Sequence, residues 1–350
     1  MAITGAITGS GTGSVAGPGT GSSAGSSTRP STPSGSGGGE RGIVVDGAHR
    51  SFGSVRAVAS VDLTARAGAV TALIGPNGSG KTTLLLMLAG LLVPDAGRMT
   101  VDGFDPVTEG YAARSLVGWM PDAFGTWDSL TAREVLTTVG AAYRLSRADA
   151  ARRATELLDT VHLTELADSP ARVLSRGQKQ RLGLARALVH DPSVLLLDEP
   201  AGGLDPRSRV DLRVLLRRLA AEGRTVLVSS HVLTELDEMA DDAVFLSQGR
   251  TVAAQTVQAA AAARRTWRVR ALSARSLAAW LTQVHVPWKA EDPAAPPSDG
   301  AGALLIALDG EASAAALLKD AVTAGVAVTS LAPVGGALEQ TYLSLEEERR

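Results

Sequence analysis

The stretch GPNGSGKT at residues 75–82 decides the fold of this chain. It matches the pattern G-x-x-x-x-G-K-[ST], in which a glycine-rich loop joins a strand to a helix and wraps a phosphate chain. The flanking sequence predicts that context, because the apolar run Ala69–Ile74 indicates a buried strand and Thr83–Ala89 the start of a helix. We therefore expect this loop to bind phosphate through backbone N–H groups at the helix N-terminus.

Two side chains of the loop carry chemistry. Lys81 supplies a positive charge toward the outer phosphates, and Thr82 offers a hydroxyl to Mg²⁺. The glycines of the loop allow backbone torsions and a close approach that a Cβ atom would block. The alternative is an ordinary glycine turn in which Lys81 is merely exposed.

The composition limits the kinds of protein that this chain can be. Its 350 residues, of which 45% are hydrophobic, suffice for one large α/β domain and a smaller one. The formal net charge of −2 gives no reason to expect a nucleic-acid partner, and the absence of cysteine excludes disulfides and thiolate zinc sites. Because no apolar run approaches the ~18 residues that span a bilayer, a membrane task would require another chain.

A second motif, VLLLDEP, occupies Val194–Pro200. Its apolar residues indicate a central strand, and Asp198 and Glu199 stand at the carboxyl end, where parallel sheets bind ligands. We expect Asp198 to hold Mg²⁺ together with Thr82, and Glu199 to accept a proton from an attacking water. The alternative is a strand that ends in two solvated acids.

Two ring-bearing side chains are further candidates. His231 follows the strand predicted at Thr225–Ser229, so it shares the sheet edge with Glu199, and we interpret it as a γ-phosphate contact rather than a structural histidine. Phe52 lies about two dozen residues before the phosphate loop and precedes a glycine. Its spacing fits either stacking on a purine base or a core position.

A block of helices interrupts the α/β pattern before Asp168. Thr131 and Glu134 form a capping box at one helix start, and periodicity predicts another helix over Leu145–Asp168. The adjacent arginines Arg152 and Arg153 are expected on the solvated face of that helix. Farther along, the LSRGQ stretch begins another helix, for which Ser175 is the expected cap.

Five motifs follow one another: GPNGSGKT, LSRGQ, LLLDEP, GGLDP and the SSH ending. Over about 210 residues, from Gly42 to Arg250, they resemble the nucleotide-binding subunit of ATP-binding cassette (ABC) transporters. The resemblance implies an α/β fold, a P-loop NTPase of ABC type with an inserted helical subdomain. The strand and helix order after Trp267 adds a small C-terminal α+β domain. The expected cofactors are ATP and Mg²⁺.

The resemblance also implies roles for individual residues. Glu199, His231 and Lys81 are the expected catalytic residues, and Phe52 resembles the adenine-stacking aromatic. The implied nucleotide-binding residues are Phe52, Gly75, Pro76, Asn77, Gly78, Ser79, Gly80, Lys81, Thr82 and Thr83. The implied signature is Leu174, Ser175, Arg176, Gly177 and Gln178, and the implied D-loop is Gly203, Leu204 and Asp205.

One position departs from the family pattern. The Q-loop glutamine is replaced by Asp122 in the stretch GWMPD, which looks like the branch that serves ABC-2-type exporters of drugs, ions or polysaccharides. That branch commonly has arginine in the signature, as at Arg176 here. The expected metal ligands are therefore Thr82, Asp198 and Asp122, with ATPase activity retained but tuned.

In the family two cassettes pack head to tail, so that Ser175 of one faces the γ-phosphate held by Lys81 of the other. The resemblance thus implies a second ATPase subunit, in the form of a homodimer, and a polytopic membrane permease as partners, with no nucleic acid and no zinc. It places the chain in the cytoplasm, at the inner face of the cell membrane. The alternatives are an importer subunit and a soluble cassette acting on ribosomes or DNA.

The expected organisation has four parts. A Gly/Ser/Thr-rich tail cannot bury enough apolar surface to become ordered, and it lacks the basic start of a secretory signal. The predicted boundaries are 1–40 for this tail, 42–257 for the ATPase domain with its helical subdomain at about 123–173, 258–266 for a linker, and 267–350 for the C-terminal domain.

Overall fold

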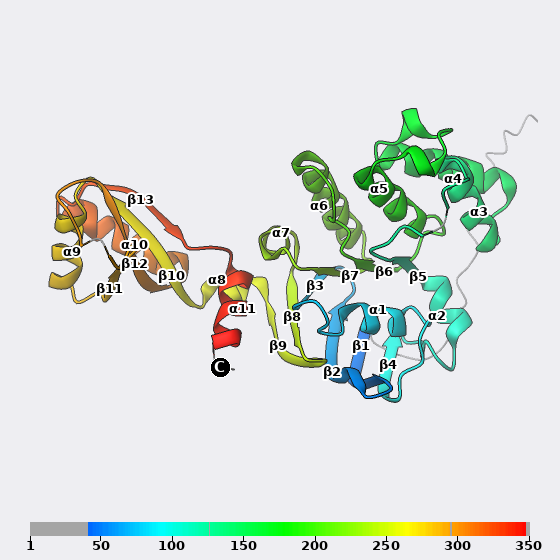
Figure 1. Cartoon of the computed structure of the whole chain (residues 1–350), viewed down its shortest axis with the longest axis horizontal. Coiled ribbons are helices and arrows are strands. Elements are labelled where there is room, and N and C mark those ends of the chain that lie inside the picture. Colours follow the sequence, from blue (N-terminus) through cyan, green and yellow to red (C-terminus); the bar gives the residue numbers. More distant parts are fainter. Residues whose placement is uncertain (1–40, 126, 295, 348–350) are drawn as a thin grey trace, which may run out of the picture. The chain divides into compact units, whose positions relative to one another are not determined.

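The computed structural model describes residues 41–125, 127–294 and 296–347, so the tail predicted at 1–40 lies outside the described residues. Within them, the strands form two sheets (Figure 1). The larger has nine strands in the order β4-β1-β2-β9-β8-β3-β7-β6-β5, and the smaller has four in the order β11-β12-β10-β13. The predicted α/β fold with an added small α+β domain is confirmed.

The centre of the larger sheet is parallel and buried. Alternate residues of each strand enter opposite cores. Val70 and Ala72 of β3 pack on one side, and Leu73 packs on the other side with helix α1 (Lys81–Leu88). Apolar residues throughout these strands are what a sheet covered on both faces requires. The strands of this central part are β3 (Val70–Ile74), β5 (Val117–Met120), β6 (Val194–Asp198), β7 (Thr225–Ser230) and β8 (Asp242–Ser247).

The other end of this sheet is largely antiparallel. A two-residue turn joins β1 (Gly42–Phe52) to β2 (Val55–Arg66), and Gly53 adopts a positive φ of 59° there. Register shifts along β1 break the regular alternation of apolar and polar residues, so the sequence pattern alone indicates only part of this hairpin. The remaining strands are β4 (Ala96–Val101) and β9 (Arg250–Thr256).

Helices follow most strands of the larger sheet. Asp205 caps α6 and accepts a hydrogen bond from the backbone N–H of Ser208, so this helix begins at Pro206. Helix α8 forms within the segment expected to be a linker, where Thr256 caps it. The bounds are α1 (Lys81–Leu88), α2 (Gly110–Leu116), α6 (Pro206–Ala221), α7 (Leu233–Met239) and α8 (Val257–Ala262).

The inserted helical block is built as the sequence indicates, with one difference. Thr131 and Glu134 form the predicted capping box. The helix expected over Leu145–Asp168 ends at Thr160, because His162 adopts a left-handed φ of 55° that stops it. The block contains α3 (Ala132–Ala142), α4 (Arg147–Thr160), 3₁₀ turns at Thr164–Leu166 and Ala171–Val173, and α5 (Arg176–Ala187).

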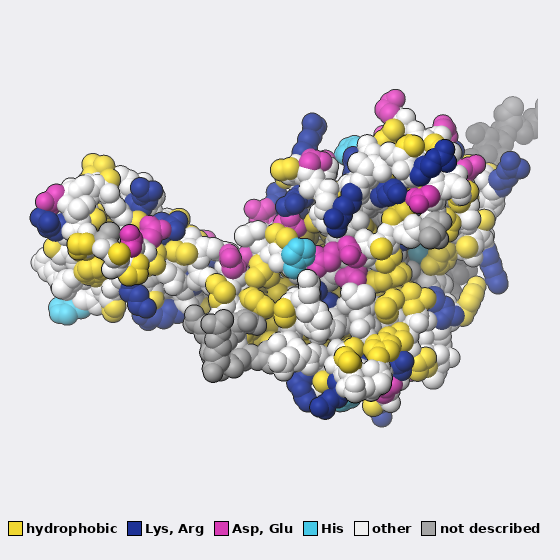
Figure 2. All heavy atoms as spheres, in the orientation of Figure 1, with side chains coloured by type: hydrophobic (Ala, Val, Ile, Leu, Met, Phe, Trp, Pro, Cys, Tyr) yellow, Lys and Arg dark blue, Asp and Glu magenta, His cyan; other side chains and the backbone are white. Residues whose placement is uncertain are grey.

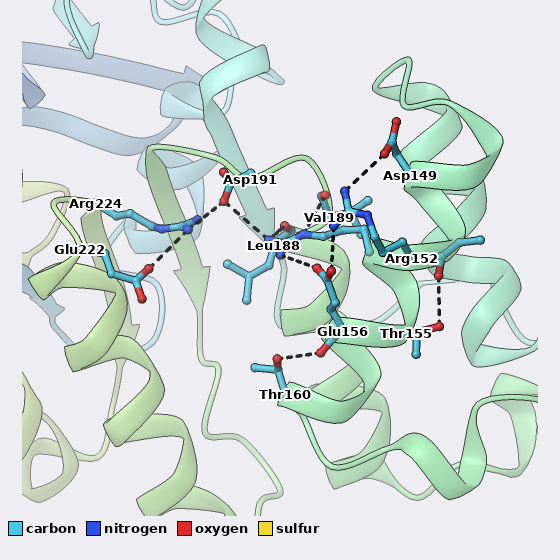
Figure 3. A network of polar contacts seen from close by, with 12 residues as sticks. Asp149, Arg152, Thr155, Glu156, Thr160, Leu188, Val189, Asp191, Glu222 and Arg224 are labelled. Carbon is cyan, nitrogen blue, oxygen red and sulfur yellow. Dashed lines mark hydrogen bonds and ion pairs between the residues drawn. The ribbon is translucent and has the colours of Figure 1, made fainter. Parts of the chain in front are cut away.

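A polar network attaches this block to the sheet (Figure 3). Arg153 of α4 donates to the carbonyl oxygen of Leu188 at 3.0 Å and lies 3.6 Å from Asp191. Asp191 also pairs with Arg224, before β7, at 2.8 Å. The expectation that both arginines of the pair at 152 and 153 are solvated is therefore wrong for Arg153, whose guanidinium caps the C-terminal carbonyls of α5.

The smaller sheet has its own core, which includes Trp267, Leu277 and Ile306. Its βαββαβ order and antiparallel pairing are those of a ferredoxin-like unit. The elements are β10 (Arg264–Ala271), α9 (Ala274–Gln283), β11 (Trp288–Ala290), β12 (Gly302–Asp309), α10 (Gly310–Thr323) and β13 (Val328–Pro333).

The last helix, α11 (Ala337–Glu347), returns to the larger domain. Leu338 is fully buried in a core of that domain, and its backbone N–H donates to Asp237 of α7 at 2.9 Å. Burial raises the pKa of Asp237, and the N–H groups at the start of α11 oppose that shift. Of the helices described, none is long and apolar enough to cross a membrane.

Candidate functional site

The site lies where three parallel strands end. β3 pairs with β7 up to Ile74 and Ser230, and β7 pairs with β6 up to Ser229 and Asp198. The phosphate loop after β3, the acidic pair that ends β6 and the histidine after β7 are therefore neighbours. Figure 2 shows acidic side chains gathered beside a histidine on the face of the molecule that it draws.

The loop needs glycine at two positions for different reasons. A Cβ atom on Gly75 would lie 2.4 Å from the carbonyl oxygen of Leu246, so only glycine fits between the loop and β8. Gly80 has a φ of 101°, and a Cβ atom there would lie 2.4 Å from the carbonyl oxygen of Ala57. This geometry orients the first free N–H groups of α1 toward the loop.

Lys81 is not the exposed lysine of an ordinary turn. Only 6% of it is exposed, and its Nζ donates to the carbonyl oxygens of Gly75 at 2.7 Å and Pro76 at 3.3 Å. Burial lowers the pKa of the Lys81 amino group, and the nearby carboxylates of Glu199 and Asp198 oppose that shift. The loop thus holds a buried cation above its own carbonyls, at the place where a phosphate chain would be wrapped.

Thr82 and Asp198, the two oxygen ligands expected for Mg²⁺, are in direct contact. The Thr82 hydroxyl donates to Oδ2 of Asp198 at 2.8 Å, and the Ser229 hydroxyl donates to its Oδ1 at 2.6 Å. No group of three or more His, Asp or Glu side chains within the described ranges is arranged to hold a metal alone. A hydroxyl and one carboxylate suit Mg²⁺, which takes its other ligands from phosphates and water.

Glu199 and His231 are in direct contact. Nδ1 of His231 lies 2.8 Å from Oε2 of Glu199. The glutamate side chain is 17% exposed and the histidine side chain 64%, so a largely buried carboxylate contacts a largely exposed imidazole. The alternative of two solvated acids after β6 is excluded, because Asp198 is buried as well.

Phe52 is not a core residue. It is 49% exposed at the end of β1, and the guanidinium of Arg50 lies 4.9 Å from its ring centroid. The beginning of β2, to which β1 is joined, touches the phosphate loop through the carbonyl of Ala57 near Gly80. The core position is therefore wrong for Phe52, and its stacking on a purine base stays a prediction.

The signature stretch begins α5 as a capping box. The Ser175 hydroxyl accepts from the N–H of Gln178 at 3.2 Å, and Oε1 of Gln178 accepts from the N–H of Ser175 at 2.8 Å. Leu174 is buried beneath this turn. No hydrogen bond or ion pair joins residues 174–178 to residues 75–82 in the part of the chain that the structure describes, so one chain does not bring the two motifs together.

The D-loop lies against the signature. Gly203 has a φ of 76°, and a Cβ atom there would lie 2.8 Å from Cδ of Arg176, so the stem of that arginine crosses the glycine. Leu204 is buried. The hydroxyl of Ser208 and its backbone N–H both donate to Asp205, which lowers the pKa of that carboxyl.

Asp122 lies near the site without joining it. A Cβ atom on Gly202 would lie 3.9 Å from Oδ1 of Asp122 and 3.1 Å from the carbonyl oxygen of Glu199. Within the described residues, Asp122 forms no hydrogen bond or ion pair with Thr82 or Asp198. Its role as a metal ligand stays a prediction.

Two residues that contact Glu199 were not predicted from the sequence motifs. The Gln180 side-chain amide donates to the carbonyl oxygen of Glu199 at 2.8 Å, and the Ser229 hydroxyl accepts from the Glu199 N–H at 3.1 Å. Gln180 stands five residues after the signature serine, and Ser229 two residues before His231. A polar side chain within an otherwise apolar, buried segment is the feature of the sequence that could have indicated each of them.

Comparisons with known proteins show similarity to ABC transporter ATP-binding proteins. The family described as ABC transporter matches residues 58–202. The chain is 40% identical over 214 residues to the daunorubicin resistance ATP-binding protein DrrA3 of Streptomyces coeruleorubidus, covering 61% of this chain and 68% of the relative. It is 36% identical over 222 residues to the Nod factor export ATP-binding protein I of Ralstonia nicotianae, covering 63% and 69%.

An importer subunit is similar too. The sulfate/thiosulfate import ATP-binding protein CysA of Thermosynechococcus vestitus is 40% identical over 210 residues, covering 60% of this chain and 62% of that one. Among solved structures, the ATP-binding subunit of an ABC transporter superposes with a TM-score of 0.58 at 28% identity, covering 63% of this chain and 91% of that one. A dimeric post-hydrolysis cassette bound to ADP and Pi has a TM-score of 0.57 at 26% identity, covering 61% and 98%.

Proposed function

Because the chain belongs to the ABC transporter family, as an ATP-hydrolysing nucleotide-binding subunit, we propose that it powers export through a separate membrane permease. The observation that carries the ATPase part is the convergence of Lys81, the Thr82–Asp198 pair and the Glu199–His231 pair at one sheet edge. Asp122 in the Q-loop position, together with the drug-resistance and Nod-factor relatives, supports export.

The proposed chemistry follows from the positions of these groups. Lys81 leaves the carbonyls of its own loop and binds the β- and γ-phosphates of ATP. Thr82 and Asp198 would hold Mg²⁺, which would neutralise the phosphate oxygens. Glu199 takes a proton from the water that attacks the γ-phosphorus, and His231 binds the γ-phosphate and fixes the Glu199 carboxylate.

We propose a head-to-tail homodimer as the active form. Among the described residues, Ser175 caps α5 at the surface and the signature makes no hydrogen bond or ion pair with the phosphate loop of its own chain. This separation supports a second cassette that completes the site. Two of the similar solved cassettes are described as dimeric. ATP bound at each phosphate loop would then join the signature of one chain to the Lys81 of the other.

The permease would be contacted by the helical block and the loop at Asp122. The chain would therefore work at the cytoplasmic face of the cell membrane, where ATP is available. We keep the division into an ATPase domain at 42–257, a connection at 258–266 and an accessory domain at 267–350 as part of this proposal. The accessory domain supplies α11, whose Leu338 packs in the core of the ATPase domain.

Co-purification of the tagged chain from its native membranes tests the proposed partner. An unrelated tagged protein serves as the control bait. Recovery of a polytopic membrane protein, identified by mass spectrometry, supports the transporter role, and the relatives of that protein then indicate export or import. Recovery of ribosomes or DNA-bound proteins without a membrane protein would contradict the export proposal and leave the ATPase chemistry standing.

A further inference from the structure

Glu199 adopts an unusual backbone conformation for a residue with a long side chain. Its φ is 50°, in the left-handed region that residues other than glycine rarely adopt. Such a conformation persists only when surrounding contacts hold it. The direction of the Glu199 carboxylate depends on this backbone conformation, and therefore on the contacts that hold it.

Four hydrogen bonds hold the peptide groups of Glu199. Its N–H donates to the carbonyl oxygen of Ser229 at 3.2 Å and to the Ser229 hydroxyl at 3.1 Å. Its carbonyl oxygen accepts from the N–H of Gly202 at 3.0 Å and from Nε2 of Gln180 at 2.8 Å. Two of the four therefore come from side chains, one on β7 and one on the signature helix α5.

The Gln180 side chain that donates to Glu199 is buried. It is 6% exposed, although glutamine is mostly an exposed residue type. It lies one turn and a half after the Ser175 cap of α5, so its amide bridges the inserted helical block and the end of β6. A buried amide that donates to one carbonyl oxygen costs free energy if that acceptor moves away.

We propose that Gln180 is a positioning residue for Glu199, and that with Ser229 it fixes the left-handed backbone that aims the carboxylate at the attacking water. Gln180 also connects the signature turn of its chain with the Glu199 of the same chain, which act on two different ATP molecules in the proposed dimer. Its helix begins with the signature turn that meets the ATP of the partner, while its amide holds the glutamate that acts on the ATP of its own chain. Engagement of Ser175 would thus be transmitted to Glu199. This inference rests on the proposed ATPase dimer.

The test compares Gln180→Leu and Gln180→Glu with the wild-type chain. Neither variant has the amide donor, and neither changes a group that touches nucleotide. Because misplacement of a reacting group by about 1 Å lowers rates on the order of 10²-fold, we expect kcat to fall about 10- to 100-fold. The KM for ATP should stay within about twofold, because the phosphate loop and Phe52 are untouched. Ser229→Ala, which removes the other side-chain contact together with the Ser229 hydrogen bond to Asp198, should lower kcat at least as much.

The matched control is Gln255→Leu, which removes the amide that donates to Thr341 far from the site. It should leave kcat unchanged. Thermal melting of each variant shows whether the fold is retained. If Gln180→Leu melts early, the nearly isosteric Gln180→Glu decides the question.

A second measurement separates this inference from the proposed function. In a Glu199→Gln background, Gln180→Leu should still form the ATP-bound dimer, because Gln180 contacts the backbone of residue 199 and touches neither ATP nor the signature turn. Loss of that dimer, or a rise in KM without a fall in kcat, would overturn the positioning role. Absence of ATP turnover in the wild-type chain itself would instead contradict the proposed function.

Discussion

The Nδ1 atom of His231 lies 2.8 Å from Oε2 of Glu199, across the ends of two adjacent parallel strands. The carboxylate is largely buried, and the imidazole that contacts it is largely exposed. This relationship joins two residues 32 positions apart in the sequence into one unit. It places a carboxylate and an imidazole together at the sheet edge that also carries the phosphate loop.

The first prediction concerns His231→Ala. Removing the imidazole should lower kcat on the order of 10²-fold, as loss of one donor to a developing negative charge does. Binding of ATP should change little, because Lys81 and the loop N–H groups remain. Steady-state turnover and nucleotide titration measure the two effects. His285→Ala, at an exposed turn of the C-terminal domain, is the control, and a change in affinity without a change in kcat would contradict the assignment.

The second prediction concerns the base of the nucleotide. Phe52→Ala should weaken ATP binding about tenfold, since stacking of a base on an aromatic side chain contributes about 1–3 kcal/mol. Phe52→Tyr should bind as the wild type does, because the ring is kept. Titration with a fluorescent ATP analogue measures both. Equal affinity of the alanine and tyrosine variants would show that the ring does not meet the base.

Asp122 gives the third prediction. Replacing its carboxylate with the neutral amide in Asp122→Gln should raise the Mg²⁺ concentration for half-maximal ATP turnover about threefold, since fewer charged oxygens attract the ion. A Mg²⁺ titration of ATPase activity measures this. Asp159→Asn, an exposed acid on α4, is the control for lost charge. An unchanged Mg²⁺ dependence and an unchanged turnover would end the idea that Asp122 tunes the site.

A half-buried histidine outside the site makes the free energy of unfolding depend on pH. His190 stacks on Tyr143 with ring centroids 3.6 Å apart, and its Nε2 lies 3.1 Å from the carbonyl oxygen of Val117. Burial lowers the pKa of His190 to about 4. Between that value and the ordinary pKa of about 6.5, the unfolded chain binds more protons than the folded one. Stability from this residue is therefore complete above pH 6.5 and is lost as the pH falls toward 4.

The fourth prediction follows from this loss of stability at low pH. The free energy of unfolding should fall by about 2 to 3 kcal/mol more between pH 6.5 and 4 than it does in His190→Gln. Glutamine does not titrate, and its amide replaces the Nε2 donor. Chemical denaturation at several pH values measures the difference. Parallel pH profiles for the two proteins would contradict the lowered pKa of His190.

The sequence predicts the site because short motifs carry their own local geometry. GPNGSGKT specifies a loop and helix start, and the apolar runs around Asp198 and His231 specify strands that end at one edge. The hairpin of β1 and β2 is less visible, since bulges interrupt its alternation, and His162 ends a helix that periodicity would continue. These features depend on backbone torsions that no pattern of apolar residues encodes.

The contacts of Gln180, Ser229 and Arg153 were not predictable in the same way. Each joins segments far apart in the sequence, and each side chain is of a type that usually faces water. From the sequence, Arg153 is expected to be a solvated charge on α4, and only the fold shows that the end of α5 lies beside it. The fold has to bring the acceptor carbonyls near before such residues acquire a role.

The most direct test of the central claim is Glu199→Gln, assayed for ATP turnover and for mass in solution by light scattering with and without ATP. The amide keeps the size of the carboxylate but accepts no proton, so hydrolysis should fall by at least about 10²-fold while ATP still binds. We predict that this variant accumulates as an ATP-bound dimer and that the wild-type chain does not. A variant that turns over ATP at the wild-type rate, or that stays monomeric with ATP bound, would contradict the account.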